Sequence, residues 1–140
     1  MTPEGIILHH SLTRDSRTMS WGAIRRHHIE TMGWRDIGYH FGVEQVGDDY
    51  EILSGRFPDV VGAHTKGQNL WSLGVCFVGN YDIANPTPGM WKKGVALVRW
   101  LMYEFKIDVD HVFPHSDFAA KTCPGLRFGI PRFKEALMNP

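Results

Sequence analysis

The alternation of apolar and polar residues predicts several short strands along the chain. A branched apolar run, GIILHHS at residues 5–11, is flanked by Thr, Pro and Gly and indicates a buried strand that ends in two histidines. Residues 39–53 contain two extended segments around a Gly-Asp-Asp sequence, which favours a hairpin turn. The apolar run LGVCFVG at 73–79 predicts a third strand, and DVDHVFPH at 108–115 is compatible with a further short one.

Three other segments carry the apolar spacing of helices. Residues 20–34 follow this spacing, with Ser20 placed to cap the first turn. The strongest pattern covers residues 87–105, where Thr87 is a candidate cap and a proline occupies the first helical position. Residues 130–138 predict a final helix that also begins near a proline.

Strands that alternate with helices indicate an α/β protein, and the hairpin excludes a purely parallel sheet. We therefore expect a mixed central β-sheet flanked by helices, formed by residues 1–140 as a single domain. The chain length supports one hydrophobic core without disulfides or metals. Residues 54–72 are rich in Gly, Pro, Asn and Ser, so they are expected to form surface loops, where functional groups often lie.

Charge and composition narrow the class of partner. Fifteen Lys and Arg balance fifteen Asp and Glu, so the chain lacks the basic surface expected of nucleic-acid binders or of proteins attracted to anionic membranes. The N-terminal MTPEGIILHH has neither a basic n-region nor a long apolar h-region. We expect a protein that is made in the cytoplasm without a signal peptide and that has no nucleic-acid or membrane partner.

The two cysteines occur in different settings. Cys76 lies in a predicted buried strand, where a free thiol behaves as a small apolar residue. Cys123 lies in VFPHSDFAAKTCPG, residues 112–125, which suits a loop or a single helical turn. A disulfide between the two is the alternative to a free, functional Cys123.

His, Cys and carboxylate side chains are the usual ligands of catalytic zinc, which takes three of them and leaves a fourth position open. One histidine at the end of the first strand, either His9 or His10, could combine with His115 and Cys123. Successive strand residues point to opposite faces, so His9 and His10 cannot both reach one metal from a regular strand. Periodicity does not choose between them, and a loop histidine beside a half-buried thiol is the simpler alternative.

Four segments in order give the chain a family resemblance: IILHHS, GWRDIGYHF, GAHTKGQNLWSLGVCFVGNYD and HSDFAAKTCPG. Together they resemble the zinc-dependent N-acetylmuramoyl-L-alanine amidases (amidase type 2), the family that includes phage T7 lysozyme and the peptidoglycan recognition proteins. The resemblance covers nearly the whole chain and implies the α/β fold of that family.

The resemblance also implies a set of site residues. Its zinc ligands correspond to His9, His115 and Cys123, with Zn²⁺ as the cofactor. Tyr39 and Lys121 correspond to catalytic residues of the cleft, although composition alone would describe them as a strand tyrosine and a solvated loop lysine. Which of the two donates the proton is left open.

Substrate contacts are expected from the middle segment. His64 and Asn69 are candidates to line the groove, and a polar surface loop is the alternative for both. Trp71 is a candidate for contact with glycan or peptide, although a tryptophan next to a strand more often packs in the core. His40, beside Tyr39, is expected to be structural.

The implied function is zinc-dependent hydrolysis of the amide bond between N-acetylmuramic acid and L-alanine in peptidoglycan. We expect a monomeric phage-type endolysin or autolysin that acts on the cell wall and takes peptidoglycan or a muropeptide as substrate. The alternatives are a non-catalytic peptidoglycan-binding module and a cytosolic amidase that recycles muropeptide fragments. A protein target such as a phage RNA polymerase is a third alternative, for which the residues give no support.

Overall fold

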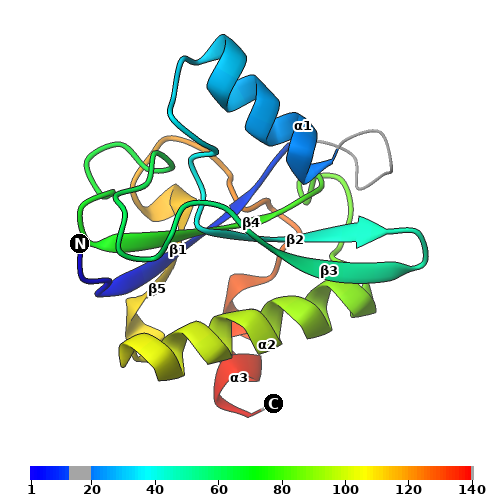
Figure 1. The fold of residues 1–140 in the computed structure, drawn as a ribbon. Coiled ribbons are helices and arrows are strands. Elements are labelled where there is room, and N and C mark those ends of the chain that lie inside the picture. Colours follow the sequence, from blue (N-terminus) through cyan, green and yellow to red (C-terminus); the bar gives the residue numbers. More distant parts are fainter. Residues whose placement is uncertain (13–19, 140) are drawn as a thin grey trace.

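A computed structural model describes residues 1–12 and 20–139 of the chain. At its centre is a five-stranded sheet with the order β3-β2-β4-β1-β5 (Figure 1). The predicted strands are all present, with these bounds: β1 Gly5–His10, β2 Phe41–Val46, β3 Asp49–Ser54, β4 Ser72–Phe77 and β5 Val112–Pro114.

The sheet is mixed, as predicted. β1 runs parallel to both β4 and β5, and β4 runs parallel to β2. Only β3 is antiparallel to its neighbour, because it forms a hairpin with β2. Gly47 opens that turn with a φ of 64°, a conformation that glycine adopts without steric strain.

The helices lie on both faces of the sheet, α1 on one and α2 and α3 on the other (Figure 1). Among the described residues no helix combines the length and the apolar character needed to cross a bilayer. The helical elements are α1 Trp21–Arg26, η1 His27–Thr31, α2 Pro88–Phe105, η2 Val109–His111, η3 His115–Asp117 and α3 Ile130–Met138.

The predicted caps are confirmed, whereas the first helix differs from the prediction. The Ser20 hydroxyl accepts a hydrogen bond from the Ala23 N–H, 3.1 Å away. The regular α-helix ends at Arg26, and the next five residues form a π-helical turn. The Met32 N–H donates to the His27 carbonyl five residues earlier, so the turn is wider than an α-helical turn.

Successive side chains of a strand point to opposite faces of the sheet, so each face carries its own set of buried residues. Ile6 and Leu8 of β1 belong to the core cluster that contains the buried side of α2 and α3. On the other face, Cys76 of β4 packs in a smaller cluster with Trp21 and Ile37. The larger apolar core therefore lies between the sheet and the helices α2 and α3, and the smaller cluster lies on the α1 face.

Gly38 is required where two loops meet on the α1 face. A Cβ atom at this position would lie 2.1 Å from the Ala63 carbonyl oxygen. We expect Gly38→Ala to lower the free energy of unfolding by about 2 kcal/mol, because backbone must move to relieve the clash. Chemical denaturation measures the effect. Gly22→Ala is the control: its Cβ has ordinary contacts, and replacing a helical glycine should stabilise by up to ~1 kcal/mol. Equal stabilities of the two variants would contradict the prediction.

Candidate active site

The sheet geometry decides between the two histidines that end β1. His9 stands level with Cys76 of β4, so both side chains are on the α1 face. His10 is on the opposite side, where its ring stacks on Tyr81 and its Nδ1 accepts the Tyr81 N–H at 3.1 Å. Only His9 therefore faces the region where Tyr39 lies, with a distance of 5.2 Å between the two ring centroids.

His115 and Cys123 reach His9 from the chain that follows β5. β5 ends at Pro114, and His115 opens the short η3 turn directly after it. A hydrogen bond of 2.9 Å from the Ser116 N–H to the Cys123 carbonyl holds the two ends of this loop together. One donor atom each of His9, His115 and Cys123 lies within 4.8 Å of the others, and all three residues are buried.

Burial sets the protonation of these groups. It lowers the pKa of His9 well below its usual value and also lowers the pKa of His115, so both rings are neutral at pH 7. Burial raises the pKa of the Cys123 thiol to about 11, an effect opposed by the His10 N–H, which donates to Sγ at 3.3 Å, and by the Lys121 charge. Neutral imidazoles and a thiol that a metal can deprotonate are the donor set of a zinc site.

Tyr39 and Lys121 share the cavity above these donors. The cavity has a volume of about 210 Å³ and contains all three donor residues in its lining, together with Tyr39 and Lys121. Burial, with the nearby Cys76 and Cys123 thiols, raises the pKa of Tyr39 well above its usual value, so its hydroxyl keeps its proton. Lys121 is exposed. The cavity thus combines a neutral hydroxyl donor with a cationic side chain.

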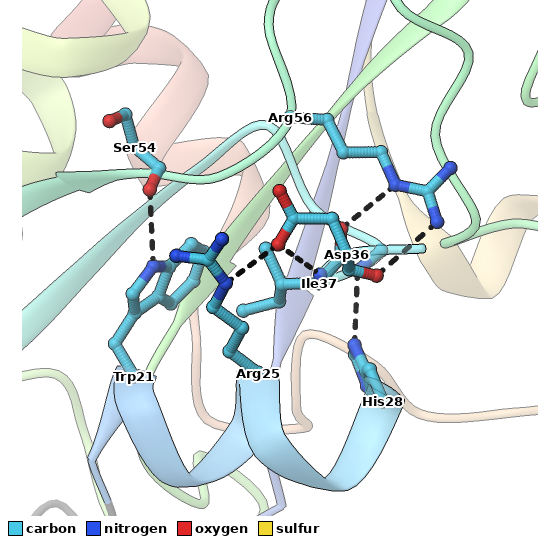
Figure 2. A network of polar contacts seen from close by, with 8 residues as sticks. Trp21, Arg25, His28, Asp36, Ile37, Ser54 and Arg56 are labelled. Carbon is cyan, nitrogen blue, oxygen red and sulfur yellow. Dashed lines mark hydrogen bonds and ion pairs between the residues drawn. The ribbon is translucent and has the colours of Figure 1, made fainter. Parts of the chain in front are cut away.

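Arg56 holds the segment that leads into Tyr39 (Figure 2). Its guanidinium donates to the carbonyl oxygens of Ile37 at 2.9 Å, Val61 at 2.8 Å and Asp36 at 3.3 Å. The Arg56 backbone N–H also donates to the Tyr39 carbonyl at 3.0 Å. One side chain therefore joins the loop after β3 to the backbone that positions Tyr39.

The first helical segment fixes the same backbone from the other side (Figure 2). Arg25 of α1 forms an ion pair with Asp36, with 2.8 Å between Nε and Oδ1. His28, in the π-helical turn, accepts the Gly38 N–H at Nδ1, 3.0 Å away. The turn of wider radius thus brings an acceptor to the backbone immediately before Tyr39.

A larger open groove adjoins the cavity. Its volume is about 510 Å³, and two aromatic side chains, Trp34 and Phe118, contribute to its walls. The groove and the cavity have five lining residues in common: Trp34, Ala63, His64, His115 and Lys121. A ligand in the groove therefore has direct access to the buried donors.

Of the three residues predicted to contact substrate, two line this groove, namely His64 and Asn69. Asn69 does so, and its Oδ1 also accepts the N–H groups of His64 and Thr65, each at 3.0 Å. Trp71 lines neither the groove nor the cavity. Its ring packs against Phe113, and its indole N–H donates to the Gln68 side chain at 2.9 Å.

The remaining predicted residues have structural contacts. Both ring nitrogens of His40 are used, Nε2 by the Val60 carbonyl at 2.7 Å and Nδ1 by the Gly74 N–H at 3.0 Å. Cys76 is a fully buried free thiol, and Cys123 is also free.

Thr65 was not predicted as a site residue, yet its hydroxyl lies 3.2 Å from Nε2 of His9. Its position next to His64 was the only signal in the sequence.

Comparisons with known proteins identify the family of the chain. Residues 1–126 match the model of the family described as N-acetylmuramoyl-L-alanine amidase. The endolysin of Klebsiella phage KP32 is 35% identical over 133 residues, which cover 93% of this chain and 84% of that endolysin.

Solved structures give the same result for the fold. The amidase LysC from Clostridium intestinale superposes with a TM-score of 0.85 at 30% identity, over 99% of this chain and 87% of LysC. Peptidoglycan recognition protein LE, solved in complex with tracheal cytotoxin, gives a TM-score of 0.78 at 30% identity, over 91% of this chain and 77% of that protein. The chain therefore belongs to the N-acetylmuramoyl-L-alanine amidase family.

Proposed function

We propose that His9, His115 and Cys123 bind one zinc ion, with which the protein hydrolyses the amide bond between N-acetylmuramic acid and L-alanine in peptidoglycan. The observation that carries this proposal is the convergence of three buried donor atoms within 4.8 Å. Three protein ligands of this kind leave the fourth zinc position for water or substrate. Family membership supplies the identity of the bond that is cut.

The chain's own residues complete the requirements of amide hydrolysis. When bound, zinc supplies Lewis-acid chemistry, because it polarises a carbonyl and makes water a stronger acid. Lys121, at the exposed side of the cavity, holds a positive charge near the oxygen that becomes negative in the tetrahedral intermediate. Tyr39 presents a protonated hydroxyl that orients the attacking water or assists proton transfer to the departing nitrogen.

The groove beside the cavity suits the stem peptide of the substrate. His64 and Asn69 provide polar contacts along it, and Trp34 and Phe118 provide apolar walls. A related recognition protein has been solved with tracheal cytotoxin, a monomeric diaminopimelic acid-type peptidoglycan, which supports this substrate class. Trp71 lies outside the groove, so a contact from it would require a longer glycan or peptide.

The relatives favour an enzyme that acts on the bacterial wall. Several similar phage proteins are named endolysins, and we propose the same use for this chain.

All the site residues come from one chain, so a monomer is sufficient. Residues 1–140 form a single amidase domain in this proposal, since α3, beyond the matched segment, contributes Phe133 and Leu137 to the same core.

Zinc titration tests the proposal. Metal-free protein should take up one zinc per chain, and amidase activity on purified muropeptides should rise in proportion to the zinc that is bound. A protein that binds peptidoglycan but does not cleave it when loaded with zinc would contradict the proposal and favour the binding module.

Tyr39→Phe removes only the hydroxyl of the proposed donor. We expect kcat to fall about 100-fold, because general acid-base groups typically contribute a factor of this size or more. Zinc affinity should stay within twofold of the original protein, since the proposed ligands are His9, His115 and Cys123. Steady-state kinetics and zinc competition on the same preparation separate the two effects. An unchanged kcat would exclude Tyr39 from the chemistry.

A further inference from the structure

His64 lies between β4 and the proposed metal ligand His9. Its Nε2 is 3.3 Å from the Ser72 carbonyl oxygen, and its Nδ1 is 3.0 Å from Nε2 of His9. The ring packs flat against Gly74, where a Cβ atom would lie only 2.5 Å from the His64 Cγ. The ring is therefore held in one orientation by the strand below it.

These contacts determine which nitrogen of each ring carries the hydrogen. A neutral imidazole has one N–H and one lone pair. The Ser72 carbonyl can only accept, so the hydrogen of His64 is on Nε2 and its Nδ1 is an acceptor. The hydrogen between His64 and His9 then belongs to Nε2 of His9. The Nδ1 of His9 keeps its lone pair, and this atom lies 3.8 Å from the Cys123 Sγ.

We propose that His64 is a positioning residue that fixes the tautomer of His9, so that Nδ1 of His9 is ready to bind the metal before the metal arrives. This inference rests on the proposed zinc site and assigns to His64 a function distinct from its contact with the groove. Metal-binding histidines commonly donate their second ring N–H to a partner that orients the ring. Here that partner is another histidine, which is itself oriented by a backbone carbonyl.

Thr65 takes part in this arrangement but does not determine it. Its Oγ1 lies 2.9 Å from Nδ1 of His64 and 3.2 Å from Nε2 of His9. A hydroxyl both donates and accepts, so it is compatible with either tautomer of His9. His64 removes this ambiguity, because two acceptor lone pairs facing each other at 3.0 Å would repel.

Two variants of His64 test the inference. His64→Asn keeps an acceptor oxygen close to the position of Nδ1, whereas His64→Leu removes it. Nitrogen-15 spectra of metal-free protein with labelled histidine report the tautomer of His9, and competition with a chromophoric chelator reports the zinc affinity. We expect the Nε2–H tautomer of His9 in the original protein and in His64→Asn. We expect His64→Leu to lose this preference and to bind zinc about 10–100-fold more weakly, while His64→Asn stays within about threefold of the original protein.

The outcomes separate this inference from the proposed function. Zinc affinity and a His9 tautomer that are both unchanged in His64→Leu would overturn the inference. An Nδ1–H tautomer of His9 in the original metal-free protein would also overturn it, even if His64→Leu does not fold. If the original protein has the expected tautomer but binds no zinc, the tautomer assignment is supported and the proposed zinc function fails.

Discussion

Cys123→Ala is expected to remove zinc binding and amidase activity together. The thiolate is the only anionic ligand of the proposed set, and the remaining two imidazoles would hold the ion without charge compensation. Zinc binding at structural sites is worth about 10–16 kcal/mol over four ligands, so one ligand corresponds to ~3 kcal/mol, or more than about 100-fold in affinity. Metal analysis after dialysis and release of alanine amino termini from muropeptides measure the two losses.

Cys76→Ala is the matched control for this change. Cys76 is also a buried free thiol, but it packs against Trp21 and Ile37 and is not among the grouped donor residues. We expect this variant to bind zinc as tightly as the original protein, with a loss of ~1 kcal/mol in the free energy of unfolding from the small cavity. A Cys123→Ala protein that retains zinc and cleaves muropeptides would exclude the proposed ligand set.

Lys121→Met is expected to slow the chemical step without removing zinc. The substitution keeps an unbranched side chain that is one atom shorter and removes the charge beside the cavity. Loss of one preorganised donor to a developing oxyanion costs about 3–4 kcal/mol, so kcat should fall about 100–1000-fold. KM should change much less, because the charge acts mainly on the transition state.

Lys92→Met, on the exposed surface of α2, is the control for a general effect of charge removal. It should leave kcat, KM and zinc affinity within twofold of the original values. If Lys121→Met raised KM while kcat stayed the same, Lys121 would be a substrate-binding residue and not part of the chemistry.

Local sequence patterns were sufficient to predict most of the strands and helices of the fold. The strands, the hairpin and α2 follow from apolar periodicity, caps and turn residues, which act over a few neighbouring positions. The first predicted helix is confirmed as helical from Trp21 to Thr31, but the change to a π-helical turn after Arg26 was not predicted. Within that turn, Nδ1 of His28 accepts a hydrogen bond from the Gly38 N–H. Such a contact joins residues ten positions apart and leaves no trace in a helical pattern.

The site required information that spacing alone does not contain. Periodicity left His9 and His10 as equal candidates, since the choice depends on which face of the sheet α2 and α3 cover. The family resemblance named His9, and the packing gives the physical reason. For Trp71 the packing does not support the predicted substrate contact. Trp71 belongs to a segment that resembles the family, but its ring lies beside Gly5 and Phe113 and not in the groove.

The contacts of Arg56 and His64 were also beyond sequence reasoning. Arg56 donates to backbone carbonyls of two separate segments, and backbone acceptors carry no residue-type signal. His64 was a candidate because of its place in a segment that resembles the family, but its bond to the Ser72 carbonyl could be found only in the folded chain.

The measurement that tests the central claim most directly is the appearance of new alanine amino termini on purified bacterial sacculi. It would be made with the protein as isolated, after chelation, and after zinc is restored. We predict release that is lost on chelation and returns with zinc, with no increase in sugar reducing ends. Release that persists in fully chelated protein, or protein that sediments with the sacculi without releasing alanine termini under any condition, would contradict a zinc-dependent amidase.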